Sequence, residues 1–208
     1  MYNIHPSREL NNLFKSKPYQ GVEPSLAHFL FIGLDANYQE DIESKEIFKK
    51  ITDYHEDSVV FWQKYNVHHP FLLSDYRGDG QRYHRNFSKI GFKAEHANQI
   101  SFVELLHVPT VGRNKLHFTD LDENHLAMIG NAIFYGKPKH IFVSANVLQL
   151  MRDSKRFSWL SKINQTKEIL PVIFSKNEKS IYKHLHFSNY GKFQLQLEKE
   201  ALAIFNLM

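Results

Sequence analysis

The chain has 208 residues, of which 42% are hydrophobic and 23% charged, with a formal net charge of +4 and a pI of about 9.1. This composition suits one globular domain, residues 1–208, and the small positive charge allows an anionic partner without requiring one. Cysteine is absent, which excludes disulfides, thiolate nucleophiles, iron–sulfur clusters and cysteine-based zinc sites. The sequence shows neither an apolar signal segment nor a membrane-spanning run, so we expect a cytoplasmic protein with no membrane partner and favour a monomer.

Strand patterns alternate with helix patterns along the chain. The continuous apolar run 29–32 predicts a first strand that is buried on both faces. Helices are predicted at 8–14, 43–54, 57–65, 81–90, 121–135, 146–152 and 193–207, and further strands at 99–106, 140–144, 172–175 and 180–187. The last two strands read as a hairpin. The alternation favours an α/β protein, a three-layer α/β/α sandwich around a central, mainly parallel four-stranded sheet.

Polar residues follow the first strand directly. Gly33 allows a turn or a close approach, and Asp35, Asn37 and Tyr38 come next. Ligands of open α/β sheets bind at the carboxyl ends of the strands, so these side chains are candidates for a site. The alternative is an ordinary loop in which Asp or Asn caps the next helix.

A second polar stretch, 182–193, lies near the other end of the chain. His184 and His186 are two positions apart, which would put both imidazoles on one face of a strand, with His186 at its end. Because the carboxyl ends of parallel strands converge on one edge, we expect Asp35 and His186 to face each other.

These two segments together resemble the motifs of the uracil-DNA glycosylase superfamily. That family carries Gly-x-Asp-Pro-Tyr after its first strand and His-Pro-Ser before a loop that enters DNA; this chain has Gly33-Leu34-Asp35-Ala36-Asn37 and His186-Phe187-Ser188-Asn189-Tyr190. The resemblance implies hydrolysis of the N-glycosidic bond of an altered base that is flipped out of DNA. Asp35 would orient water, and His186 would stabilise the departing base. No metal or cofactor is implied.

The resemblance also implies contacts to the base and to DNA. The base would meet Gly33, Asn37, Tyr38 and Glu104, and DNA would meet Arg113, Lys115, Ser188, Asn189 and Tyr190, the last as a wedge. Ala36 and Phe187 replace the family's prolines, and Glu104 or Val103 stands nearest the place where many members read the base with Asn. An ionised carboxylate there offers only acceptors and would favour a base edge rich in donors. These departures favour the alternative hypothesis, a non-catalytic module that binds nucleic acid or protein.

Three other features of the sequence bear on its function. The histidines at 68, 69, 84 and 96, with Asp75 and Asp79, raise a third hypothesis, a metal-dependent nuclease, although surface or hydrogen-bonded histidines are the more ordinary interpretation. The segment 76–89 mixes basic and aromatic side chains, which suits either a nucleic-acid backbone or a solvated helix face. His5-Pro6-Ser7 spells the second motif but precedes the first strand, so we assign it no function.

Overall fold

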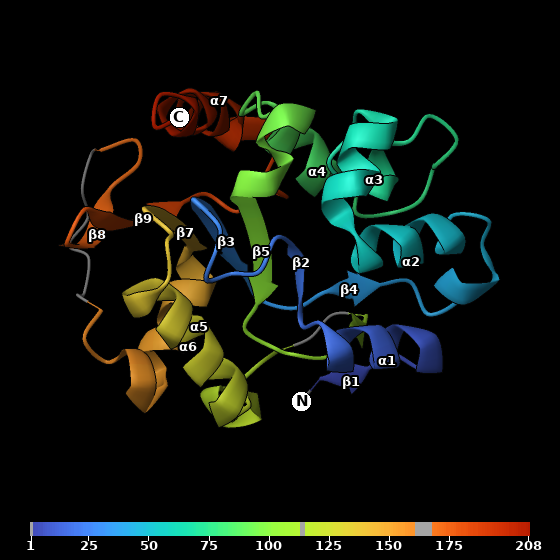
Figure 1. Ribbon diagram of the computed structural model, residues 1–208, viewed down its shortest axis with the longest axis horizontal. Helices are drawn as coiled ribbons and strands as arrows, with labels where there is room; N and C mark the ends of the chain where they lie inside the picture. Colours follow the sequence, from blue (N-terminus) through green and yellow to red (C-terminus); the bar gives the residue numbers. More distant parts are fainter. Residues whose placement is uncertain (1, 113–114, 161–167) are drawn as a thin grey trace.

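A six-stranded sheet forms the centre of the computed structural model, which describes residues 2–112, 115–160 and 168–208 (Figure 1). Its strands, in spatial order, are β2 (Tyr19–Gly21), β5 (Ile100–Glu104), β3 (Phe29–Gly33), β7 (His140–Ser144), β9 (Lys179–His184) and β8 (Val172–Lys176). The pairs β5–β3, β3–β7 and β7–β9 are parallel, whereas β2 and β8 pair antiparallel at the two edges. The carboxyl ends of β5, β3, β7 and β9 therefore share one edge of the sheet, which we call the carboxyl edge.

The predicted α/β class is confirmed, but the sheet has six strands rather than four. The hairpin of β8 and β9 was expected, and it adds one edge strand. β2 has only three residues, all half-buried, and so carries no apolar run that would reveal a strand. It pairs with β5 because the chain passes along that edge.

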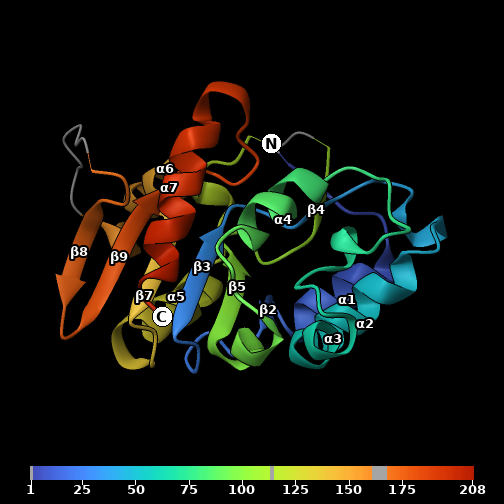
Figure 2. The ribbon, with the colours of Figure 1, turned by 90° about the horizontal axis from the view of Figure 1, so that it is seen from above.

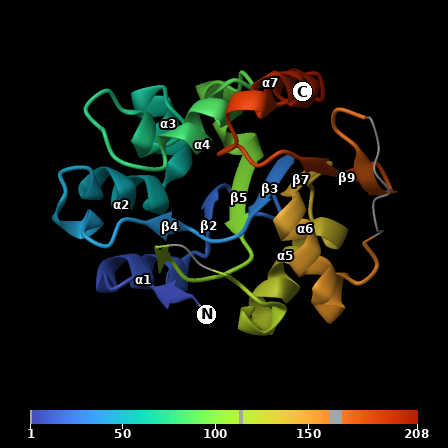
Figure 3. The same ribbon diagram turned by 180° about the vertical axis from the view of Figure 1, so that it is seen from behind.

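Helices pack on both faces of the sheet (Figures 2 and 3). One face is covered by α5 (Glu123–Tyr135) and α6 (Ala145–Asp153), and the other by α3 (Ser58–Tyr65), α4 (Gln81–Ser88) and α7 (Gln194–Phe205). Successive residues of β3 alternate between the two cores, as the pleat of a strand requires: Leu30 and Ile32 face α5 and α6, whereas Phe29 and Phe31 face the other layer. All four are at most 3% exposed, as the apolar run predicts.

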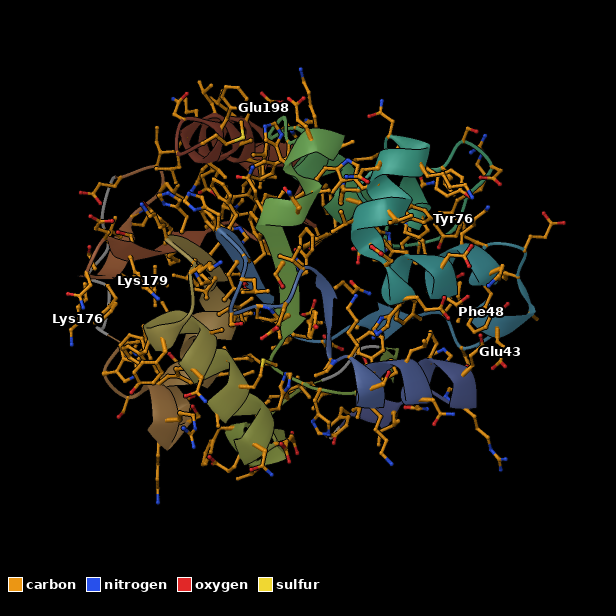
Figure 4. The ribbon with its side chains drawn as sticks, viewed as in Figure 1. Glu43, Phe48, Tyr76, Lys176, Lys179 and Glu198 are labelled. Atoms are coloured by element: carbon orange, nitrogen blue, oxygen red, sulfur yellow. The ribbon has the colours of Figure 1, made fainter. Side chains whose placement is uncertain are left out.

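A smaller three-stranded sheet adjoins the carboxyl edge. It consists of β1 (Asn3–Ile4), β6 (Thr110–Val111) and β4 (Asn37–Tyr38). It lies beside α1 (Arg8–Ser16) and α2 (Phe48–Glu56). Apolar residues of both helices, Phe48 of α2 among them, form one cluster with Tyr76 (Figure 4). Ser7 caps α1 by accepting a hydrogen bond from the Leu10 N–H, so the early His-Pro-Ser sequence begins a helix in this structure.

Several boundaries differ from the predicted ones. The helix predicted at 43–54 begins at Phe48, and a short 3₁₀ turn precedes it. The strand predicted at 180–187 ends at His184, because its partner β7 ends at Ser144 and passes directly into α6. Short 3₁₀ helices occupy Ile42–Ser44, Pro70–Leu72, Ala94–Gln99, Phe118–Asp120, Lys155–Phe157 and Gly191–Phe193. Across the three described ranges, every helix is too short or too polar to traverse a bilayer.

Candidate active site at the carboxyl edge

Asp35 lies just past the end of β3 and is held by the small sheet. The Thr110 hydroxyl donates to its Oδ2 at 2.5 Å, and the Thr110 N–H donates to the Ala36 carbonyl at 2.9 Å. The Asn37 amide in turn donates to Thr110 Oγ1 at 3.0 Å and to the Gly112 carbonyl at 2.7 Å. Thr110 is fully buried, so this chain of hydrogen bonds fixes the Asp35 carboxylate from behind.

Asn37 and Tyr38 both make hydrogen bonds to other residues of the protein. Both amide hydrogens of Asn37 have protein acceptors, which leaves its carbonyl oxygen for other contacts. Tyr38 is 5% exposed and belongs to the apolar cluster of α1 and α2, and its hydroxyl accepts a hydrogen bond from Gln20. Tyr38 thus packs in the interior and leaves only 5% of its surface exposed, which argues against contact with a base.

Glu104 ends β5 directly opposite Gly33 of β3. Its Oε2 lies 2.0 Å from the point where a Cβ on residue 33 would lie, so the missing side chain of Gly33 makes room for this carboxyl. His125 of α5 contacts the Glu104 carbonyl oxygen at 2.7 Å and fixes the end of the strand. Burial, reinforced by the negative charge of Asp35, raises the pKa of Glu104 to about 8.

His186 reaches the same edge from the loop after β9. Its Nδ1 accepts a hydrogen bond from the Ser188 N–H at 3.3 Å, with the Ser188 hydroxyl at 2.6 Å. A backbone N–H can only donate, so in the neutral ring the proton sits on Nε2, which becomes a donor. His186 is an exposed residue, but partial desolvation of its ring by neighbouring side chains lowers its pKa, and the negative charge of Asp35 raises it in part. Asp35 and His186 thus both follow strands that end at the carboxyl edge, and the expected meeting of their side chains stays a prediction.

His184 does not share this position. It is 6% exposed, its ring packs against Phe187, and its Nδ1 lies 2.6 Å from the Leu185 carbonyl oxygen. The prediction that both imidazoles lie on one strand face is wrong, because the strand ends at His184 and the chain changes direction there. Burial lowers the pKa of His184 to about 4, which keeps the ring neutral in the core.

Two helices hold the loop that carries His186. Asn86 of α4 is 7% exposed and donates to the Phe187 carbonyl at 2.6 Å and to the Asn189 carbonyl at 3.2 Å. From α7, the buried Glu200 carboxylate accepts the Leu185 N–H at 2.7 Å. Both ends of the loop are thus tied to the helix layer on the same face of the sheet.

Aromatic and basic side chains border the site. Tyr83 of α4 packs beside His186, with ring centroids 5.3 Å apart, and burial together with the charge of Glu104 raises its pKa. Tyr190 is 66% exposed, and the guanidinium of Arg82 lies 4.3 Å from its ring centroid. Ser188 and Lys115 are also exposed, whereas Arg113 lies outside the described residues.

The histidines of the middle segment form a packed stack. His69 and His84 lie face to face with ring centroids 3.5 Å apart, and His68 Nε2 is 3.2 Å from His84 Nδ1. Burial lowers the pKa of His68 to about 3. Parallel rings in contact cannot direct their nitrogens at one ion, and no group of three or more potential ligands with metal-site geometry occurs among the residues that the structure describes.

A cavity of about 500 Å³ lies elsewhere, between α1 and α5, and includes His107 and His125. Neither Asp35 nor His186 lines it. It touches the site only through His125, which holds the Glu104 backbone. We therefore define the candidate site by its side chains at the carboxyl edge and not by this cavity.

Sequence patterns did not reveal Thr110 or Asn86 as parts of the site. Thr110 follows Pro109 in a loop with no motif, and Asn86 sits within an ordinary helical segment. Their roles depend on contacts with residues 75 and 101 positions away, respectively. Neither family models nor curated proteins give a match to this chain.

Proposed function

We propose that this protein is a DNA glycosylase-like hydrolase that releases an altered base flipped out of DNA. The observation that carries the proposal is the placement of Asp35 directly after β3 and of His186 after β9, two parallel strands whose carboxyl ends share one edge of the sheet. A carboxylate beside an imidazole N–H donor provides the two groups that hydrolysis of an N-glycosidic bond needs.

In this mechanism Asp35 accepts a hydrogen bond from water and directs its oxygen at the sugar carbon C1′. The water oxygen bonds to C1′ and its proton passes to Asp35, while the C1′–N bond breaks and its electron pair leaves with the base as an anion. His186 donates its Nε2–H to the base oxygen on which negative charge develops. One such donor contributes roughly 2.7–4 kcal/mol of transition-state stabilisation, by analogy with oxyanion-hole donors. Thr110 holds Asp35, and Asn86 holds the His186 loop, so both groups keep fixed positions.

The proposal extends to the fold and to DNA. The parallel strands β5, β3, β7 and β9, with helices on both faces, support assignment to a three-layer α/β/α sandwich. The exposed Tyr190 with Arg82 supports a wedge that enters the gap left by the flipped base. Lys115 and Ser188 are exposed and could contact phosphates.

The test is base release from duplex and single-stranded oligonucleotides that carry uracil, hypoxanthine or xanthine. Asp35→Asn should abolish release and leave DNA affinity close to that of the wild type. Glu40→Gln, an exposed carboxylate in the same region, is the matched control and should retain activity. DNA binding without release by the wild type would support the alternative, a binding module. Release that requires a divalent metal would support the nuclease hypothesis.

A further inference from the structure

The cavity between α1 and α5 is separate from the carboxyl edge. Its volume of about 500 Å³ lies in the range of cavities that hold small organic molecules. Its apolar lining comes from three segments: Phe14 and Pro18 at the end of α1, Val108 in the loop after β5, and Met128 of α5. None of the proposed catalytic residues lines it, so what binds there does not depend on the proposed function.

His125 presents a hydrogen-bond acceptor at the wall of this cavity. The side chain lines the cavity and is 6% exposed. Its Nε2 lies 2.7 Å from the Glu104 carbonyl oxygen, which can only accept, so Nε2 carries the proton and Nδ1 is an acceptor. Burial lowers the pKa of His125, which keeps the ring neutral at pH 7. Within the described ranges, no hydrogen bond reaches this Nδ1.

Two further polar residues restrict what the cavity can hold. Both amide hydrogens of Asn11 donate to backbone carbonyls, those of His5 and Ser7, each at 2.7 Å, so Asn11 Oδ1 is a second acceptor. The exposed Lys15 places a positive charge beside the cavity, which disfavours a cationic ligand. A molecule that fits these groups is therefore neutral and supplies a hydrogen-bond donor.

His107 gives an independent indication of a ligand. It lines the same cavity, with its ring centroid 5.8 Å from that of His125. Its Nδ1 is enclosed and, in the part of the chain that the structure describes, has no hydrogen-bond partner. Interior nitrogens are seldom left unpaired, and here two histidines beside one cavity each have such an atom. Together with Phe14, these histidines also give the cavity an aromatic wall.

We propose that this cavity binds a neutral aromatic molecule that carries a hydroxyl donor, the class to which phenols belong. The O–H donates to His125 Nδ1, and the ring packs against Phe14 and Met128, where ring–ring and sulfur–ring contacts add to the burial of apolar surface. The bound donor polarises the imidazole, so the hydrogen bond from His125 Nε2 to the Glu104 carbonyl becomes stronger.

The first test compares phenol with toluene on the full chain. The two molecules have nearly the same size and shape, but only phenol has a donor. Each is titrated into the ¹⁵N-labelled protein and followed by NMR. Phenol should bind saturably, with shift changes in α1, α5 and Val108, and should move the Nδ1 resonance of His125. Toluene covers this nitrogen without pairing it, so its affinity should be at least about fivefold weaker.

The second test fills the cavity. Met128→Trp enlarges a side chain of the cavity wall and should weaken phenol binding at least about tenfold. Asn131→Trp adds the same side chain at an exposed position of α5 outside the lining and should leave the affinity unchanged. The absence of saturable phenol binding, toluene binding as tight as that of phenol, or unchanged affinity in Met128→Trp would each overturn the inference. The comparison of the two ligands uses the wild type, so it decides the matter if Met128→Trp does not fold.

Discussion

Replacement of Asn86 tests whether α4 holds the loop that carries His186. Its side-chain amide donates two hydrogen bonds, to the Phe187 carbonyl at 2.6 Å and to the Asn189 carbonyl at 3.2 Å. Asn86→Asp keeps the shape and removes both donors, so two carbonyls lose their partner and face a carboxyl instead. An unpaired buried polar group costs about 1–3 kcal/mol, and the second carbonyl is only partly buried. We expect the free energy of unfolding to fall by about 2–3 kcal/mol.

The measurement is urea unfolding at pH 7.5, followed by circular dichroism and by the fluorescence of the tryptophans. Ser88→Ala is the control, because Ser88 is an exposed residue of α4 whose hydroxyl bonds only within the helix. It should change the free energy of unfolding by less than about 0.5 kcal/mol. In Asn86→Asp, the ¹⁵N shifts of His186 should also show a mixture of tautomers as the loop loosens. A destabilisation no larger than that of the control, with an unchanged His186 spectrum, would refute the role of Asn86.

Three further predictions concern Gly33, His68 and Tyr190. Gly33→Ala places a Cβ 2.0 Å from Glu104 Oε2, so the Glu104 carboxyl must move. Base release should be lost, while the free energy of unfolding measured in urea should change by less than about 1 kcal/mol. Normal base release by this variant would contradict the prediction. Burial lowers the pKa of His68 from 6.5 to about 3, so the unfolded state binds this proton first as pH falls. The contribution of His68 to the free energy of unfolding is therefore complete above pH 6.5, and about 2 kcal/mol of it should be lost by pH 5. His68→Phe should remove this loss, which is measured by urea unfolding at the two pH values. Tyr190→Ala should slow base release from duplex more than from single strands, where no stack must be opened, and equal slowing would make Tyr190 a packing residue.

The long apolar patterns predicted the main elements because burial alone determines them. The strand at 29–32 and the helix at 121–135 are both present, within two residues of the predicted limits. By contrast, β1, β4 and β6 have two residues each, and their hydrogen bonds join segments far apart in the chain. No local pattern can encode such a pair, so the small sheet behind Asp35 was not predicted.

The end of β9 shows a related limit. Leu185, His186 and Phe187 continue the strand pattern, yet the Leu185 N–H bonds to the Glu200 carboxylate instead of a neighbouring strand. The deciding fact is the length of β7, which ends at Ser144 and leaves no ladder beyond it. Where a strand stops therefore depends on its neighbour. The loop after β9 then brings His186 beside Tyr83 of α4.

The sequence pattern identified Glu104 as a candidate but could not indicate the pKa of its carboxyl, which depends on burial and on neighbours brought together by the fold. Gly33 leaves room for the carboxyl, and the register of β3 with β5 sets Glu104 against it. Thr110 then supplies a hydrogen bond to Asp35, so the two carboxyls, similar in chemistry, meet different surroundings at one edge. Burial raises the pKa of Glu104 to about 8, which leaves its carboxyl able to donate a hydrogen bond near neutral pH. The parallel pairing of β3 with β5 is what brings the two carboxyl groups to one edge of the sheet, although Asp35 and Glu104 are 69 positions apart in the chain.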